Sequence, residues 1–280
     1  MPTHPLGLAP LGFLDLAPPA LVTLAAGAGF TAITVRARAA VPGGPQYPLD
    51  AGGSVARETA RRLEATGLRI AQVELIGLDR HTDVESCRAM VAGGAALGAG
   101  SVVVSGDDDP AVVAERLSEV CALAAEHGMA VELEFMPFRR VRTIGDALAI
   151  IEMAGATNAR VMVDALHLHR SGGTVEAVRR APASRLGSLQ LCDAPRAAPG
   201  TTDAALAAEA RERRLLPGAG ELPLVELVEA MPPGSAVAAE VPLPPPDADR
   251  APEWRASAVA GACRTILAAS RGLGAGRGSS

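Results

Sequence analysis

The sequence predicts an α/β protein folded as a single parallel (β/α)8 barrel, and three observations point to this fold. Short apolar strands and amphipathic helices alternate eight times along the 280 residues, which is typical of parallel strands covered by helices. A chain of this length is common for an α/β barrel that forms one domain. Polar side chains also end the last four strands. A closed barrel gathers such strand ends at one mouth, whereas a doubly wound sheet, the competing architecture, spreads them along an edge.

In the first half of the chain, each predicted strand is followed by a predicted helix. Strands are expected at residues 7–13, 32–35, 69–76 and 101–104. Helices are expected at residues 18–28, 55–66, 83–97 and from 110 to 127. The last of these has the clearest boundaries. The acidic run before Pro110 supplies an N-cap and a first-turn proline, and His127-Gly128 supplies a C-terminal cation and glycine.

The second half of the chain repeats the pattern. Strands are expected at residues 129–135, 160–163, 186–191 and 236–241, and helices at residues 144–153, 174–180, 224–230 and 254–269. Thr143 is the expected cap of the first of these helices. A long arginine-rich connection follows strand seven. No low-complexity linker divides the chain, so we expect one barrel domain over residues 1–270 and a disordered Gly/Ser/Arg-rich tail over residues 271–280.

The composition excludes several classes of protein. All 26 basic residues are arginine, which excludes Schiff-base aldolases, pyridoxal phosphate enzymes and P-loop proteins because each needs a lysine. The net charge of −5 argues against nucleic acid or an anionic membrane as a partner. A hydrophobic content of 49% excludes a disordered chain, and an aromatic content of 2% predicts an aliphatic interior.

Cysteine usage and the N-terminal region predict a cytoplasmic protein. The four cysteines are widely spaced and are expected to be buried free thiols in a reducing compartment: Cys87, Cys121, Cys192 and Cys263. No basic residue precedes Arg36, so the charged region of a signal peptide is missing. The uncharged stretch 89–106 contains five glycines. It is better explained as a helix that runs into a buried strand than as a membrane span.

Four polar residues end strands five to eight within apolar runs: Glu134, Asp164, Gln190 and Glu240. Structural alternatives exist, since Glu134 could belong to a buried ion pair and Asp164 could cap a helix that carries His167 on its surface. Amides such as Gln190 also often bond to backbone. Together, however, three carboxylates at neighbouring strand ends repel one another unless a cation neutralises them. Oxygen donors favour Mg²⁺ or Mn²⁺ over Zn²⁺, so we expect one such ion bound by all four residues.

Five motifs carry a resemblance to a known family: E-F-M-P at Glu134, D-A-L-H-L-H-R-S-G-G at Asp164, Q-L-C-D at Gln190, R-L-L-P-G-A-G-E-L-P-L at 214–224, and A-E-V-P at Glu240. With them, the chain resembles the xylose isomerase-like TIM-barrel superfamily of sugar phosphate isomerases and epimerases over about residues 6–267. Three of the four ligand positions match the Glu, Asp, His, Glu metal site of that family. Gln190 stands where most members have His, and here the chain resembles the bacterial 3-dehydroshikimate dehydratases.

The resemblance implies an enzyme that uses the divalent ion as a Lewis acid on a polyol ketone or aldose. Glu134 or Glu240 would remove a carbon-bound proton to give an enediolate, and His167 would orient substrate oxygens or act as a second acid or base. Returning the proton elsewhere gives isomerisation or epimerisation of a sugar or sugar phosphate. Expelling a β-hydroxyl group gives dehydration of the 3-dehydroshikimate or inosose type. His169 is expected to be structural.

Arginines are the expected contacts for an anionic group of the substrate. Arg213 and Arg214 lie at the start of the R-L-L-P-G motif, after strand seven, where barrels often bind phosphate or carboxylate. Arg36, at the end of strand two, and His81, after strand three, are expected to face the same mouth. Arg211 is at least as well explained as part of a solvated helix face.

Two interpretations from other classes remain beside the enzyme. A non-catalytic barrel that binds a metal or ligand, or serves as a subunit of a complex, would keep the fold without needing four intact ligand positions. A nuclease of the apurinic endonuclease type needs a histidine-rich cluster of zinc ions, and the chain has only five histidines. We therefore expect a small polyol or keto-sugar substrate and no nucleic acid, with homo-oligomerisation left open.

Overall fold

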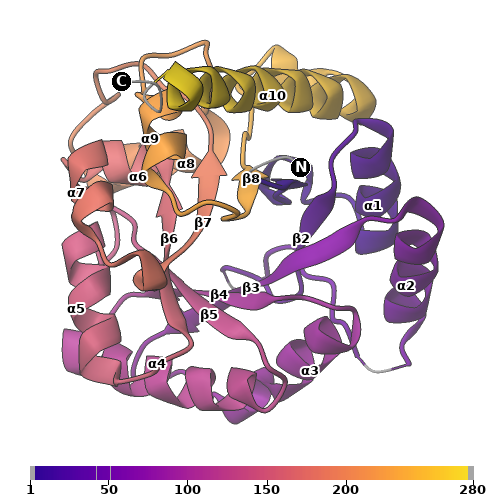
Figure 1. Ribbon diagram of the computed structural model, residues 1–280. Helices are drawn as coiled ribbons and strands as arrows, with labels where there is room; N and C mark the ends of the chain where they lie inside the picture. The colour runs from indigo at the N-terminus through magenta and orange to yellow at the C-terminus, as the bar shows by residue number, and fades with distance from the viewer. Residues whose placement is uncertain (1–3, 42, 51, 277–280) are drawn as a thin grey trace.

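Eight parallel strands form a closed barrel with helices around it, in a computed structural model that describes residues 4–41, 43–50 and 52–276. The strands follow one another in chain order, and the eighth pairs with the first to close the barrel. Figure 1 shows the helices as an outer layer around the strands. The predicted (β/α)8 barrel is confirmed.

The elements alternate as expected along the chain. The strands are β1 Leu6–Leu8, β2 Ala32–Arg36, β3 Arg69–Leu78, β4 Ser101–Gly106, β5 Ala130–Glu134, β6 Ala159–Asp164, β7 Leu186–Leu191 and β8 Val237–Ala239. The helices are α1 Pro18–Gly27, α2 Ser54–Thr66, α3 Arg88–Ala96, α4 Pro110–Ala125, α5 Ile144–Ala154, α6 Ala165–Arg170, α7 Val175–Arg180, α8 Asp203–Glu212, α9 Leu224–Ala230 and α10 Pro252–Gly276.

Some boundaries differ from the prediction. The first strand is shorter, because Pro10 starts a turn in which its carbonyl accepts from the Phe13 amide at 2.7 Å. Two helices are not among the eight expected ones: α6, the helix that the structural alternative for Asp164 describes, and α8, on which Arg211 lies. The last helix, α10, extends to Gly276 and so includes residues 271–276, which the sequence predicts as part of a disordered tail. Residues 277–280 of that tail lie outside the described residues.

The main hydrophobic core lies between the strands and the outer helices, and it is largely aliphatic. Ile33, Val102 and Val161 from the strands are fully buried with Leu117 from α4 and Ile151 from α5. Burying each such side chain stabilises the fold by roughly 1.5–3 kcal/mol relative to leaving it in water. The low aromatic content is therefore compensated by many closely packed branched side chains.

The connection between β2 and α2 packs tightly on α3. A Cβ atom on Gly93 would lie 1.9 Å from the carbonyl oxygen of Leu49, so only glycine fits at this crossing. Leu49 itself is buried. Because Ala40 of the same connection lines the cavity described below, this contact helps to position one wall of the barrel mouth.

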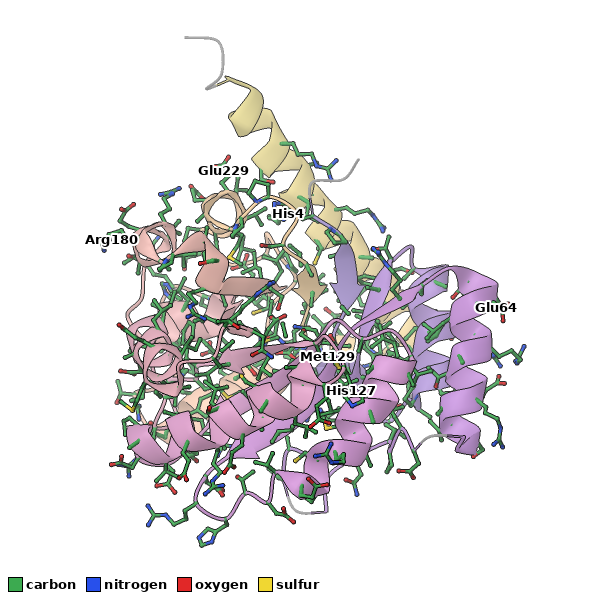
Figure 2. All side chains as sticks on the ribbon, turned by 60° about the horizontal axis from the view of Figure 1, so that its bottom comes forward. His4, Glu64, His127, Met129, Arg180 and Glu229 are labelled. Carbon is green, nitrogen blue, oxygen red and sulfur yellow. The ribbon has the colours of Figure 1, made fainter. Side chains whose placement is uncertain are left out.

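The outer layer carries charge. Figure 2 shows Glu64 on α2 and Arg180 on α7, and both side chains are exposed. None of the helices within the described ranges combines the length and apolarity needed to cross a membrane.

The barrel interior is polar at its amino-terminal end. Gln72 Nε2 donates to Ser188 Oγ at 2.9 Å, and the Ser188 amide donates to Glu132 Oε2 at 2.9 Å. Since β3, β5 and β7 are not neighbours in the sheet, these bonds cross the inside of the barrel. Side chains alternate along a strand, so the next inward-facing residues of these strands are Glu74, Glu134 and Gln190.

The amino-terminal segment contacts the segment before β8 where the barrel closes. The His4 ring Nδ1 lies 2.9 Å from the carbonyl oxygen of Ser235, and the Val237 amide donates to the Pro5 carbonyl at 2.9 Å. Figure 2 shows His4 beside the helices that complete the ring. β1 and β8 are short, and this contact adds to the few bonds that join them.

Candidate functional site

The four residues that the sequence predicts as ligands lie together at the carboxyl ends of their strands. Glu134 and Asp164 are the last residues of β5 and β6, and Glu240 directly follows β8. Gln190 of β7 pairs with Asp164 in the sheet and donates through Nε2 to Glu240 Oε1 at 3.2 Å. All four side chains are buried. The local pattern is the same in each case, an apolar strand that ends in a polar residue.

Arg214 lies between two of these carboxylates. Its Nη1 is 2.5 Å from Asp164 Oδ2 and its Nη2 is 3.1 Å from Glu240 Oε2. The guanidinium is 1% exposed, and Nε donates to the carbonyl of Ala210 at 2.7 Å. The sequence predicts Arg214 as a substrate contact. The structure places it in the same cavity but already paired with two predicted metal ligands.

Asp193 fixes the loop that carries Arg214. Its carboxylate accepts from the amides of Gly218 at 2.9 Å and Leu222 at 3.0 Å, and from the amide of Ala194 at 2.8 Å. Its backbone exchanges two hydrogen bonds with Leu215, at 2.9 and 2.8 Å. The R-L-L-P-G-A-G-E-L motif is therefore a loop folded around one buried aspartate.

Gly220 of that loop is required by the close approach of the chain. A Cβ atom there would lie 2.4 Å from the carbonyl oxygen of Ala194 and 2.4 Å from Asp193 Oδ1. No side chain fits at these distances, so the glycine lets the loop close over Asp193.

His167 is brought into the site by α6. The Asp164 side chain caps this helix and accepts from the His167 amide at 2.8 Å, so Asp164 both ends the strand and starts the helix. The His167 ring lies 3.6 Å from Glu134 Oε1 and packs edge-on against Phe138, with ring centroids 5.4 Å apart. Burial lowers the pKa of His167 to about 4, so the imidazole is neutral at pH 7.

The surroundings shift the pKa values of the three buried carboxyl groups in different directions. Burial, followed by the charges of Glu240 and Asp164, raises the pKa of Glu134 well above its usual value. Burial also raises the pKa of Glu240 to about 7, against the opposing effect of Arg214. For Asp164 the effect of burial is outweighed by Arg214 and by the hydrogen bond from His167, so its pKa is lowered.

The donor set fits a cation. Ligand atoms of Glu134, Asp164 and His167 all lie within 4.8 Å of one another. Gln190 Oε1 and His167 Nδ1 are buried and have no hydrogen-bond partner within the described residues. A buried acceptor without a partner costs about 1–3 kcal/mol, and this makes the Gln190 oxygen a further candidate ligand beside that group.

The cavity in front of these groups has a volume of about 80 Å³. Its polar wall contains Arg36, which is buried and paired with Glu74 through Nη2 and Oε1 at 2.6 Å. Its outer wall contains Phe138 and Arg211, whose guanidinium lies 5.9 Å from the Phe138 ring centroid.

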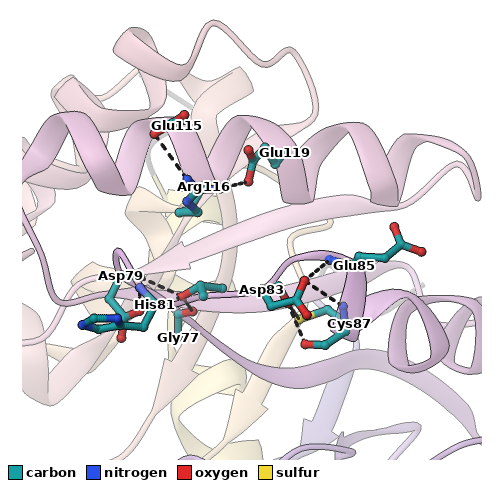
Figure 3. Close-up of polar contacts among 11 residues, drawn as sticks. Gly77, Asp79, His81, Asp83, Glu85, Cys87, Glu115, Arg116 and Glu119 are labelled. Carbon is teal, nitrogen blue, oxygen red and sulfur yellow. Dashed lines mark hydrogen bonds and ion pairs between the residues drawn. The ribbon is translucent and has the colours of Figure 1, made fainter.

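Two predicted contacts lie elsewhere. Arg213 is exposed and does not line this cavity, although the next residue, Arg214, is buried in it. His81 is exposed and lines a neighbouring cavity of about 530 Å³ that shares Arg139 with the inner one. Figure 3 shows His81 in the turn after β3, where its amide donates to Asp79 Oδ1 at 2.8 Å.

Glu74, Phe138 and Arg211 are cavity residues that the sequence prediction lacks. Glu74 had a detectable signal, because it is a carboxylate in the apolar strand β3, as Glu134 is in β5. Phe138 had a weaker one, since it follows Glu134 closely and the chain has only four Phe. Arg211 had the competing explanation of a solvated helix face.

His169 is placed away from the cavity, where its Nε2 lies 3.1 Å from the carbonyl oxygen of Arg196. The neighbouring Arg170 makes a buried pair with Glu209 of α8, with Nη2 2.7 Å from Oε1. α6 and α8, the two helices that are not among the eight expected ones, are thus joined by an ion pair beside the site.

Comparison with known proteins places the chain in a family. The family described as "Xylose isomerase-like TIM barrel" matches residues 22–258. No curated protein matches the chain by sequence. Solved structures share its fold at low identity, which by itself shows the fold alone.

Three of these solved structures illustrate the range of proteins that share the fold. The IolI protein with a bound zinc atom is 16% identical, with a TM-score of 0.76, and the match covers 94% of this chain and 98% of that one. D-allulose 3-epimerase from Methylomonas sp. is 17% identical, with a TM-score of 0.68 and coverage of 94% and 98%. The probable 3-DHS dehydratase AsbF from Bacillus anthracis is 14% identical, with a TM-score of 0.69 and coverage of 92% and 98%. From the family match over most of its length, this chain belongs to the xylose isomerase-like TIM-barrel family.

Proposed function

We propose that the protein is a divalent-metal-dependent isomerase or epimerase that acts on a small polyol ketone or aldose. The observation that carries the proposal is the cluster of three buried carboxylates with one unpartnered amide oxygen at the barrel mouth. Similar folds in D-allulose 3-epimerase and in the zinc-containing IolI protein support it.

Glu134, Asp164, Gln190 and Glu240 are the residues that would hold the ion. An ion bound there supplies Lewis acidity, which polarises a carbonyl of the substrate and acidifies the neighbouring carbon-bound hydrogen. Mn²⁺ and Mg²⁺ suit the four oxygen donors best.

Glu134 is the better candidate for the base that takes this hydrogen as a proton. Glu240 is held by Arg214 and Gln190, whereas within the described residues the Glu134 carboxylate accepts no side-chain hydrogen bond and has His167, at 3.6 Å, as its basic neighbour. A carboxylate without strong donors is the more basic one. His167 is neutral and buried beside Glu134, where it can take a proton from one substrate oxygen and return it to another.

A dehydratase is the second candidate, and Gln190 favours it. A carboxamide at this position is the feature in which the chain resembles 3-dehydroshikimate dehydratases, and the fold of AsbF is similar. Proton removal by Glu134 would be the same, but a β-hydroxyl group would then leave as water, taking up the proton that Glu134 had removed, while the neutral His167 would orient it.

The test of the proposal is an activity screen with added Mn²⁺ against keto-sugars, inososes and 3-dehydroshikimate, with deuterium uptake from D₂O followed by NMR. Metal-dependent exchange with interconversion of sugars supports the isomerase, and loss of water from 3-dehydroshikimate supports the dehydratase. If Mn²⁺ binds but no substrate exchanges, the protein is better described as a metal-binding barrel without catalysis.

Replacing Gln190 by His should keep metal binding and shift the preference towards Zn²⁺, because imidazole is a softer ligand than an amide oxygen. Competition titrations of Mn²⁺ and Zn²⁺ on the two proteins measure the shift. The same ratio of affinities in both would place residue 190 outside the coordination shell.

Metal binding should also depend on pH through Glu240. Its pKa is about 7 in the folded protein, against an ordinary value of 4.5. Between these values the folded protein keeps a proton that the unfolded chain has lost, so the metal-free protein loses stability as the pH rises through this window. An ion must displace that proton. The rise in melting temperature caused by Mn²⁺ should therefore be small near pH 5.5 and larger near pH 8, and thermal scans across the range would show whether it is constant instead.

A further inference from the structure

Arg214 sits between two of the proposed ligands rather than at the edge of the site. It bridges Asp164 and Glu240 with Nη1 and Nη2, and its own position is fixed by the Ala210 carbonyl and by its amide, which donates to the Pro242 carbonyl at 3.1 Å. Contacts with Ala210 and Pro242, in addition to those with the carboxylates, therefore hold the buried guanidinium in place.

When all three carboxylates at the site are ionised, Arg214 alone does not balance their charge. When ionised, Glu134, Asp164 and Glu240 carry three negative charges and Arg214 carries one positive charge. The second buried arginine, Arg36, is neutralised by Glu74. The remaining excess of two negative charges matches the charge of one divalent ion.

We propose that Arg214 is a built-in cation that shares Asp164 and Glu240 with the divalent ion, holding the two carboxylates together in the metal-free protein and limiting the affinity for metal. The inference rests on the proposed metal site. It assigns to Arg214 a positioning and charge-setting function that is separate from any contact with substrate.

Replacing Arg214 by a neutral residue changes the charge of the site more than it changes the orientation of Asp164 and Glu240. Asp164 keeps its hydrogen bond from the His167 amide at 2.8 Å, and Glu240 keeps its bond from Gln190 at 3.2 Å. Both carboxylates therefore stay aimed at the site. What disappears is a positive charge next to the ion, and repulsion between a unit charge and a divalent ion a few ångströms apart is worth on the order of tenfold in affinity even in water.

The test compares Arg214→Gln, Arg214→Lys and the wild type by calorimetric titration with Mn²⁺ and by thermal unfolding of the metal-free proteins. Arg214→Gln should bind Mn²⁺ on the order of tenfold more tightly and should melt at a lower temperature without metal. Arg214→Lys keeps the charge and should stay close to the wild type in Mn²⁺ affinity. The gain for Arg214→Gln should be larger with Tb³⁺, because the repulsion scales with the charge of the ion.

Arg213→Gln is the matched control, since this neighbouring arginine is exposed and does not line the cavity. It should leave the Mn²⁺ affinity unchanged. Equal or weaker Mn²⁺ binding by Arg214→Gln would overturn the inference while leaving the proposed metal site intact. If the metal-free variant does not fold, chelator competition on protein prepared with Mn²⁺, together with Arg214→Lys, gives the same comparison. Absence of Mn²⁺ binding by the wild type would overturn the proposed function and the inference with it.

Discussion

Replacing Glu134 by Gln should lower turnover by on the order of 10²–10⁴-fold, the usual contribution of a positioned general base. The substrate for this measurement is the one that the wild type converts in the activity screen. The amide has nearly the same shape as the carboxylate and cannot accept the carbon-bound proton. Deuterium exchange from D₂O into substrate should fall in parallel. Because removal of a ligand charge also weakens metal binding, turnover must be measured at saturating Mn²⁺.

Two comparisons make this result specific. Glu152→Gln, on the exposed side of α5, should leave turnover and exchange unchanged. Glu240→Gln should weaken metal binding but, at saturating Mn²⁺, retain more exchange than Glu134→Gln. If exchange survives in Glu134→Gln and is lost in Glu240→Gln, the base is Glu240 and the assignment made from the hydrogen bonds is wrong.

Replacing Asp193 by Ala should destabilise the protein by on the order of 3 kcal/mol or more and remove most of the activity. Three backbone amides, of Ala194, Gly218 and Leu222, lose their acceptor. Each buried donor left without a partner costs about 1–3 kcal/mol. The loop that carries Arg214 then has no anchor at its centre. Denaturant unfolding measures the stability loss.

Asp193→Asn distinguishes the effect of the side-chain charge from the effect of the hydrogen bonds that hold the loop. Its side-chain oxygen can still accept from Ala194 and Leu222, whereas its amide group faces the Gly218 amide and cannot. About a third to a half of the Ala effect is therefore expected. Equal stability of Asp193→Ala and wild type would show that the loop is held by its other contacts, such as the paired backbone of Leu215.

The fold and the ligand cluster could be predicted from the sequence because both depend on strand ends. An apolar strand that stops at Glu134 or Asp164 places the carboxylate at the barrel mouth wherever the strand lies in the ring. Gln190 and Glu240 follow by the same argument. The structure brings these four together, while the identity of an ion and the choice of base stay predictions.

Contacts made by connections could not be predicted in this way. Phe138 and Arg211 reach the cavity through the particular paths of the segments after β5 and within α8, which local pattern does not specify. A helix capped by Asp164 was expected only as an alternative to a ligand at that position, whereas in the structure Asp164 both ends β6 and caps α6. α8 had an overlooked signal in Thr202, whose side chain caps it and is followed by an acidic first residue.

The contact between His4 and Ser235 joins residues 231 positions apart, and it has a consequence for synthesis of the chain. While a ribosome is still translating the segment before β8, the amino-terminal strand has only β2 beside it and the seventh strand has only β6. Both edges then present unpaired backbone groups, which favour association with other nascent chains. Ring closure is therefore a late event of biosynthesis. Nascent chains stalled before residue 235 should be the forms most dependent on chaperones.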